Sequence, residues 1–429
     1  MPAVPAAVAN PPVEQVPSTR WTATPLLWLW VATRVLLLIV SLNPRLYSGG
    51  LFGDVRTYGA RVERMFQGEL PYRDIAIEYP PGSVPFTVIP GLVTGAGAGY
   101  RLAFAVEMLL VDAVGLYAAM RLARAADAAR RRIPLAYVLL MFAVGPLLVL
   151  RFDLVPAVCI LLAAALAAEG SAGWAAAALG FGTAAKLFPL VLAPLLVLGL
   201  VPAQGWGWWR TLRRTVPPFL LGFAVTVVPA LLLSVHGTLN AVNYQTARGV
   251  QIESLPANAI DLVHLATGLA TRSFLDFGAY HLASSLSAPV KTISVAATAA
   301  TLVAAVALVG WCSWRRGGLR PRDWAPAFLI GVFAFMLPAR VLSPQYLVWI
   351  AALLAGLADR RRARPALLAL VAAAAATQVI YPFRYPQLIR FDAVDIGLLT
   401  VRNLLLVAIT AVVVWTFVRP GPEAAPNPS

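Results

Sequence analysis

The sequence predicts an all-α fold: a polytopic membrane helical bundle of about twelve transmembrane helices. Of its 429 residues, 60% are hydrophobic and 12% are charged, whereas soluble domains carry about 25% charged residues. Apolar runs rich in Ala, Leu and Val recur along the whole chain. They lack the period-two alternation of transmembrane β-strands. Short basic stretches separate many of the runs, which is the pattern that orients membrane helices.

Twelve apolar segments are expected as membrane spans. They cover residues 21–42, 100–122, 133–150, 154–168, 173–185, 187–201, 216–235, 290–311, 324–337, 347–357, 365–380 and 397–418. A further apolar segment, residues 83–92, is too short to cross and is interrupted by Pro85 and Pro90. We expect this segment to be re-entrant or interfacial.

The order of spans and charges predicts where the other segments lie. Basic runs follow the second, sixth, eighth and tenth spans, so these short loops are expected in the cytoplasm. Both ends then lie inside. Residues 1–20, rich in Pro and Ala, are expected to form a disordered cytoplasmic tail, and residues 419–429 a second tail. Residues 21–418 are expected to form one integral membrane domain, with external loops at 43–99 and 236–289.

Ionisable side chains gather in the first external loop, although the chain as a whole is poor in charge. Carboxylates, arginines and tyrosines alternate between residues 52 and 85. They are Asp54, Glu63, Glu69, Asp74 and Glu78, then Arg56, Arg61, Arg64 and Arg73, then Tyr58, Tyr72 and Tyr79. Solubility does not require such a cluster in a membrane protein, so we interpret this loop as the chemical centre.

Other charged positions reach the same external face by the predicted topology. Two short spans meet at Lys186, and the tripeptide Arg151-Phe152-Asp153 joins two others. Short helices that meet at a charge favour a pocket that opens into the membrane. Arg34 and Arg402 lie within spans. The sequence leaves open whether they pair inside the bundle or line a lipid path.

The residue types at this face indicate a class of substrate. Arg and Lys suit a phosphate, a carboxylate suits general-base work on a hydroxyl, and aromatic rims suit sugar rings. Phosphate, hydrocarbon tail and sugar together describe a polyprenyl-phosphate sugar, and an external enzyme has no access to cytosolic nucleotide sugars. The net charge of +15 is explained by topology, so no nucleic-acid partner is expected. Two cysteines and three histidines match no metal motif, so we expect no metal and no cofactor.

Several motifs give the chain a more specific resemblance. Asp54 precedes Tyr58 by four residues, and a series of longer motifs follows. They are GELPYRDIAIEYPPG (68–82), RFDLVPA (151–157), AAKLFPLVLAPLL (184–196), RGVQIES (248–254) and SPQYLVW (343–349). From the first loop to the tenth span, these motifs resemble glycosyltransferase family 87 of the GT-C class. Members of that family are similar to mannosyltransferases that elongate phosphatidylinositol mannosides from polyprenyl-phosphate mannose.

The resemblance implies a GT-C-like bundle with external loop helices, and an inverting α-mannosyltransferase of the cell membrane with its active site on the extracytoplasmic face. Asp54 would be the general base. The donor phosphate would be bound by Lys186, Arg151, Arg340 and Arg248. The sugar or acceptor would contact Glu78, Tyr58, Tyr79, Gln251, Glu253, Gln345 and Tyr346. The implied partners are a polyprenyl-phosphate sugar donor, a lipid-linked or glycan acceptor, and membrane lipids. Mannose is favoured, while arabinofuranose and glucose stay open.

Each assignment has a structural alternative. Asp54 would also serve as the N-cap of a helix in the first loop, and Lys186 would also snorkel to the interface. The alternative ion pairs are Arg151 with Asp153 and Glu78 with Arg73. For the whole protein, a transporter or lipid flippase is the main rival, because twelve spans and broken helices fit one. The absence of a two-fold internal repeat in the sequence disfavours that class, and a scaffold protein would not require the clustered charges.

Overall fold

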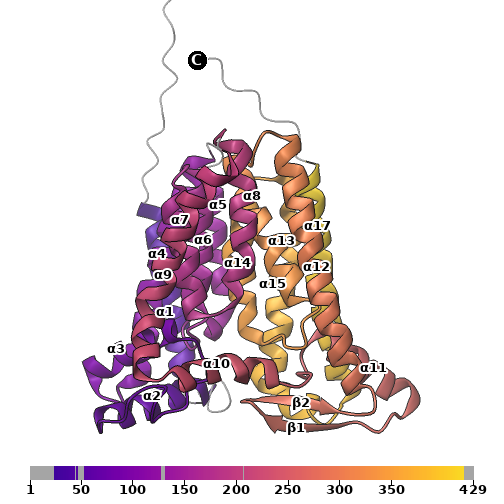
Figure 1. Ribbon diagram of the computed structural model, residues 1–429. Helices are drawn as coiled ribbons and strands as arrows, with labels where there is room; N and C mark the ends of the chain where they lie inside the picture. Colours follow the sequence, from indigo (N-terminus) through magenta and orange to yellow (C-terminus); the bar gives the residue numbers. More distant parts are fainter. Residues whose placement is uncertain (1–23, 44, 47–52, 127–130, 206, 420–429) are drawn as a thin grey trace, which may run out of the picture.

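A computed structural model describes residues 24–43, 45–46, 53–126, 131–205 and 207–419 of the chain. The predicted tail at residues 1–20 lies outside the described residues, and so does the predicted C-terminal tail from residue 420 onwards. The described part is an upright bundle of helices with a smaller cap of helices and one β-hairpin at one end (Figure 1).

Each of the twelve predicted spans coincides with a helix of the bundle. These helices are α1 (Thr24–Leu42), α4 (Tyr100–Ala125), α5 (Arg132–Ala143), α6 (Leu154–Ala168), α7 (Ala172–Ala185), α8 (Ala193–Ala203), α9 (Trp208–Leu233), α12 (Ser287–Arg315), α13 (Trp324–Met336), α14 (Leu347–Leu354), α15 (Arg364–Gln378) and α17 (Ala393–Val418). Among the described residues, six helical segments are long and apolar enough to cross a membrane by length and composition. They are α1, α4, α9, α12, the segment 361–388 and α17, and the remaining bundle helices are shorter.

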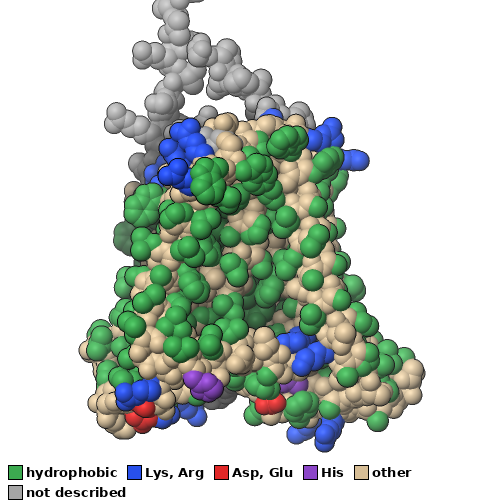
Figure 2. All heavy atoms as spheres, viewed as in Figure 1, with side chains coloured by type: hydrophobic (Ala, Val, Ile, Leu, Met, Phe, Trp, Pro, Cys, Tyr) green, Lys and Arg blue, Asp and Glu red, His purple; other side chains and the backbone are tan. Residues whose placement is uncertain are grey.

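The bundle carries the surface expected of a protein that spans a bilayer. On the face drawn in Figure 2, apolar side chains cover the middle of the molecule, and Lys and Arg gather towards its two ends. The start of α1 and the end of α17 lie at the end opposite the cap (Figure 1). This arrangement agrees with an even number of crossings, and it separates the basic loops from the carboxylate-rich loop.

Close helix packing in the bundle relies on small side chains, as in many membrane proteins. Helices α7 and α9 lie side by side, and Gly180 of α7 faces the backbone of α9. A Cβ atom built at Gly180 would lie 2.0 Å from the carbonyl oxygen of Phe219. Only glycine therefore permits this approach, which fixes the position of α7 and of the residues that follow it.

The cap is built from the two predicted external loops. The first loop forms α2 (Gly53–Phe66) and α3 (Val84–Thr94), and the second forms α10 (Val235–Ala247) and α11 (Leu255–Thr267). Helix α3 covers the predicted re-entrant or interfacial segment. Its Leu92 and Val93 are 69% and 76% exposed, and it lies beside α2 in the cap (Figure 1). These features agree with an interfacial position for α3, which stays a prediction.

One element of the cap differs from the all-α prediction. Strands β1 (Arg272–Asp276) and β2 (Ala279–Ala283) form an antiparallel hairpin. Phe277 and Gly278 at its turn have φ angles of 47° and 66°, and positive φ at both central residues is characteristic of a type I′ hairpin turn. The sequence Phe-Gly is not among the usual turn pairs, and the strands are short. The sequence therefore did not predict a hairpin in this polar loop.

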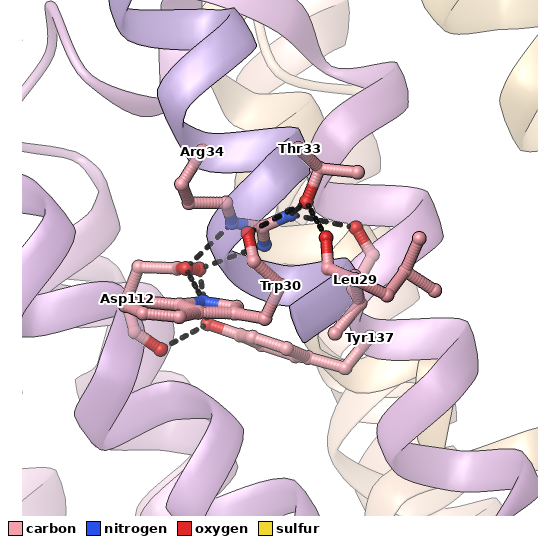
Figure 3. Close-up of polar contacts among 7 residues, drawn as sticks. Leu29, Trp30, Thr33, Arg34, Asp112 and Tyr137 are labelled. Atoms are coloured by element: carbon pink, nitrogen blue, oxygen red, sulfur yellow. Dashed lines mark hydrogen bonds and ion pairs between the residues drawn. The ribbon is translucent and has the colours of Figure 1, made fainter. Parts of the chain in front are cut away.

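A buried ion pair ties together the first three helices of the bundle (Figure 3). Arg34 of α1 is 1% exposed and Asp112 of α4 is 0% exposed. Arg34 donates from Nε to Asp112 Oδ2 at 2.8 Å and from Nη1 to the carbonyl oxygen of Val138 at 2.8 Å. Trp30 Nε1 and Tyr137 Oη also donate to the Asp112 carboxylate, at 2.5 and 2.9 Å. The sequence left open whether Arg34 pairs inside the bundle or lines a lipid path. In the structure, Arg34 pairs inside the bundle.

This network predicts a large difference between single and double substitutions. Arg34→Met or Asp112→Leu alone leaves one buried charge without its partner, which typically costs about 3–5 kcal/mol. The double variant removes both charges, so we expect it to recover most of the stability of the unmodified protein. Thermal unfolding in detergent measures this. As a control, breaking the partly exposed Arg121–Glu169 pair by Arg121→Ala should cost about 1 kcal/mol or less. Additive losses in the double variant would contradict the pairing.

Candidate active site

A cavity of about 1030 Å³ lies where the cap meets the bundle. Its walls come from α2, the loop between α2 and α3, α10, the RGVQIES segment, the hairpin turn and the ends of several bundle helices. Every predicted site residue except Arg340 lines this cavity. The lining residues of that set are Asp54, Tyr58, Glu78, Tyr79, Arg151, Lys186, Arg248, Gln251, Glu253, Gln345 and Tyr346. The structure thus brings distant segments to one place, while the roles of the residues stay predictions.

Asp54 and Arg151 form an ion pair across the boundary between cap and bundle. Helix α2 begins at Gly53, so Asp54 lies in its first turn, where the helix dipole favours a carboxylate. The Asp54 side chain is 30% exposed, whereas that of Arg151 is 6% exposed. Arg151 Nη2 also donates to Tyr381 Oη at 2.8 Å. The alternative pairing of Arg151 with Asp153 is wrong, because Asp153 has another cation beside it.

That cation is Lys186, at the break between α7 and the next helical segment. Its backbone is extended, with φ −157° and ψ 133°, and its Nζ donates to Asp153 Oδ1 at 2.5 Å. Four aromatic rings surround the ammonium, with Nζ-to-centroid distances between 5.1 and 5.9 Å. They belong to Tyr79, Phe152, Tyr346 and Trp349. Lys186 is therefore held inside the protein by an ion pair and cation–π contacts and does not snorkel outward.

The EYPPG motif brings Glu78 and Tyr79 to the cavity by packing on the end of α7. A Cβ atom at Gly82 would lie 2.5 Å from the backbone of Ala184 and Ala185, so the motif requires glycine at this contact. Glu78 forms an ion pair with Arg61 of α2. The alternative pairing of Glu78 with Arg73 is wrong.

Arg73 and Asp74 form a separate pair on the outer part of the same loop. Arg73 Nη2 lies 2.9 Å from Asp74 Oδ2, and Asp74 also accepts a hydrogen bond from the backbone nitrogen of Leu70 at 2.9 Å. These contacts give Asp74 a structural part in the loop, although it too lines the cavity.

The RGVQIES segment runs between the hairpin and the loop that carries Arg340. The backbone nitrogen of Gln251 donates to the carbonyl oxygen of Arg340 at 2.8 Å. The Gln251 side chain contacts Ser343 Oγ and Glu253 Oε2, both at 3.3 Å. Arg402 Nη2 donates to the carbonyl oxygen of Glu253 at 2.9 Å. Arg402, which lies within a predicted span, thus anchors this segment to α17.

Glu253 is a buried carboxyl group in the cavity wall, 2% exposed. Burial raises the pKa of Glu253 from its usual 4.5 to about 7, although the guanidinium groups of Arg402 and Arg151 oppose the rise. A carboxyl group with this pKa is present in both protonation states near neutral pH. It is suited to donating a hydrogen bond to a sugar hydroxyl as well as to accepting one.

Arg248 and Arg340 are neighbouring cations with different surroundings. Within the described part of the chain, Arg248 has no ion pair, and its buried Nε has no hydrogen-bond partner. Arg340 was predicted to bind the donor phosphate, but it is not among the cavity-lining residues. Its Nη2 donates to the carbonyl oxygens of Gln245 and Thr246 at 3.1 and 2.7 Å. These carbonyls end α10 and lack helical partners, so Arg340 holds the segment that presents Arg248.

The sequence interpretation did not single out several residues of the cavity wall. Tyr381 and Tyr385 line it from the segment after α15. His236, Asn240 and Tyr244 line it from α10, together with Arg248 just beyond the helix. The spacing of four residues between His236, Asn240 and Tyr244 puts these three side chains on one helical face. That spacing was a usable signal in the sequence.

Comparison with solved structures identifies the class of fold. The chain is similar to ArnT from Cupriavidus metallidurans bound to undecaprenyl phosphate, with 17% sequence identity and a TM-score of 0.51. The similarity covers 92% of this chain and 78% of that one. The apo state of the same ArnT gives 18% identity and a TM-score of 0.49 at the same coverage. The first likeness confirms the predicted GT-C-like polytopic helical fold.

No protein-family model matches the sequence, and no curated protein matches it significantly. Among the described residues, no group of three or more His, Cys, Asp and Glu side chains is arranged to hold a metal ion.

The buried Glu253 carboxyl predicts a specific pH dependence of stability. Its folded pKa is about 7 and its usual pKa is 4.5, so the charged form is disfavoured by folding. The resulting loss of stability is absent below pH 4.5, grows between pH 4.5 and 7, and is complete above pH 7. Glu253→Gln should therefore gain stability relative to the unmodified protein as pH rises through this window, by about 3 kcal/mol. Thermal unfolding of both proteins at pH 5 and pH 8 tests this, and a difference independent of pH would contradict it.

Proposed function

We propose that this protein is a membrane glycosyltransferase that moves a sugar from a polyprenyl-phosphate donor to a hydroxyl of a glycolipid or glycan. The observation that carries the proposal is the cavity at the boundary of the bundle, where the Asp54 carboxylate lies among the cations Arg151, Lys186 and Arg248. The fold supports it, because the similar structure of ArnT holds undecaprenyl phosphate. The cations of the cavity suit a phosphate, and the apolar surface of the bundle (Figure 2) suits a lipid tail.

In the proposed reaction, Asp54 accepts the proton of the acceptor hydroxyl as the acceptor oxygen attacks the anomeric carbon of the donor. The bond between that carbon and the phosphate oxygen breaks, and polyprenyl phosphate leaves with the electron pair. Attack from the side opposite the leaving phosphate inverts the configuration. A single base is enough for this displacement, because the leaving phosphate is already a weak base whose charge the cations stabilise.

The cations of the cavity differ in their availability to the donor phosphate. Lys186 and Arg151 already have carboxylate partners, whereas Arg248 has none within the described part of the chain. The Arg248 side chain is half-buried and lines the cavity, and its buried Nε lacks a hydrogen-bond partner among the described residues, so a ligand phosphate would supply the missing acceptor. We therefore assign Arg248 as the principal phosphate ligand, held in place by Arg340, with Lys186 and Arg151 nearby.

The acceptor side of the proposed site follows α10. From His236 to Tyr244, α10 lines the cavity over eight positions, which corresponds to roughly 12 Å of helix. The cavity volume of about 1030 Å³ lies at the upper end of the range for pockets that hold small ligands. That size supports simultaneous binding of the donor head group and an acceptor glycan, with Glu78, Tyr58 and Tyr79 beside the reacting atoms.

The finer assignments rest on the motifs of the sequence. The resemblance of PYRD, EYPPG and AAKLFP to family 87 supports mannose as the transferred sugar and an α-linkage as the product. The separation of the basic loops from the cap supports an active site on the extracytoplasmic face.

Asp54→Asn tests the proposed base. We expect release of polyprenyl phosphate to fall by a factor of about 10² to 10⁴, since the variant cannot accept the hydroxyl proton. The assay supplies purified protein with short-chain polyprenyl-phosphate mannose and candidate glycolipid acceptors. Asp74→Asn is the matched control, because it removes the same charge from the same cavity and should retain activity within a few-fold. Full turnover by Asp54→Asn would remove Asp54 as the base, and lipid movement across vesicles without turnover would favour a flippase.

Arg248→Gln tests the proposed phosphate ligand. A charge-assisted hydrogen bond to phosphate contributes about 1.5–3 kcal/mol, so we expect the Kd for undecaprenyl phosphate to rise about 10- to 100-fold. Titration in detergent, followed by ligand-induced thermal shift, measures the affinity. Arg73→Gln is the control, because Arg73 is paired with Asp74 at the outer edge of the cavity. Equal losses in both variants would indicate a general effect of charge.

A further inference from the structure

We propose that Arg151 exchanges partners during the reaction: it pairs with Asp54 in the empty site and with the donor phosphate in the loaded site. Donor binding would then release the Asp54 carboxylate to act as base. This inference rests on the proposed function and adds an order of events to it, because the acceptor hydroxyl meets a free base only after the donor has bound.

The geometry around Arg151 suits an exchange of one partner while the guanidinium stays in place. Its Nη2 is held by Tyr381 Oη at 2.8 Å, and its side chain is 6% exposed. Nη1 pairs with Asp54. Its buried Nε has no hydrogen-bond partner in the described part of the chain. Arg151 therefore has a fixed position, one exchangeable anion and one unused donor, and a planar guanidinium with two adjacent donors matches a phosphate.

Asp54 is the partner that is able to leave. It lies on the cap, in the first turn of α2, and its side chain is 30% exposed. The comparable carboxylate on the bundle side, Asp153, is 1% exposed and bound to Lys186. Glu253 is a third carboxyl group near Arg151, but it is buried and belongs to the wall anchored by Arg402. Because Asp54 is more exposed than Asp153 and Glu253, it is the carboxylate that an incoming phosphate would displace.

The exchange also resolves a conflict within the proposed mechanism. A carboxylate that stays paired with a guanidinium is stabilised in its charged form and is a poor proton acceptor. The reaction requires a carboxylate that accepts a proton readily. Replacing Asp54 by the phosphate keeps Arg151 paired throughout, so no buried cation is exposed during the exchange. By linkage, donor and acceptor should each strengthen the binding of the other.

Binding of undecaprenyl phosphate to purified variants tests the exchange without measuring catalysis. Asp54→Asn frees Arg151 in advance, so we expect this variant to bind undecaprenyl phosphate about tenfold more tightly than the unmodified protein, within the range of coupling between close charge pairs. Asp74→Asn, the matched loss of charge, should bind as the unmodified protein does. Arg151→Gln should bind more weakly. The double variant Asp54→Asn with Arg151→Gln should show no gain over Arg151→Gln alone.

The double variant separates the exchange from simple repulsion between carboxylate and phosphate. If Asp54→Asn tightens binding by the same factor with and without Arg151, repulsion alone explains the gain and the exchange is wrong. Equal affinity of Asp54→Asn and the unmodified protein also overturns it, while leaving the proposed glycosyltransferase function intact. Absence of binding to all folded variants would overturn the donor class and the exchange together. Asp54→Ala repeats the comparison where Asp54→Asn is poorly folded.

Discussion

The structure depends on one constraint: a charge at membrane depth is costly unless it has a partner, because the bilayer core supplies no water to solvate it. The chain meets this constraint in two ways. Arg34 and Asp112 satisfy one another within the bundle, and Trp30 and Tyr137 complete the hydrogen bonds of the carboxylate. At the boundary with the cap, the Asp54–Arg151 pair lines a cavity, and so does Lys186, which pairs with the buried Asp153. The Arg34–Asp112 pair fixes the bundle, whereas the Asp54–Arg151 pair lines the cavity.

The sequence predicted the bundle well because each span is a local feature. A run of apolar residues of sufficient length forms a helix in the membrane whatever its neighbours are, so all the predicted spans coincide with helices. The break at Lys186 was predicted for the same reason, since two short spans that meet at a charge are visible in the sequence itself. The β-hairpin was missed because each strand has five residues and its turn, Phe277-Gly278, is unusual.

Pairing between side chains was harder to predict because it depends on where the cap sits on the bundle. Arg151 is two residues from Asp153 in the chain, yet it pairs with Asp54. Arg340 has the charge of a phosphate ligand, but the unsatisfied carbonyls at the end of α10 bind it instead. The predicted topology put Arg151, Asp54 and Arg340 at one face of the membrane. It did not predict which side chains or carbonyls they would contact. The close approach of Gly82 to the end of α7 brings the segment of Glu78 and Tyr79 against the bundle.

Asp54 and Asp153 differ in burial, and this difference sets how easily each carboxylate separates from its cation. Asp153 is enclosed with Lys186 inside a ring of aromatic side chains, so separating this pair would leave two unsolvated charges, which is strongly unfavourable. Asp54 belongs to a cap helix, and the solvent that reaches it lowers the cost of separating it from Arg151. The Asp153–Lys186 pair therefore stays in place, while the Asp54 carboxylate beside it is able to separate from Arg151. That asymmetry arises from the joining of cap and bundle, which explains why the site lies at their boundary.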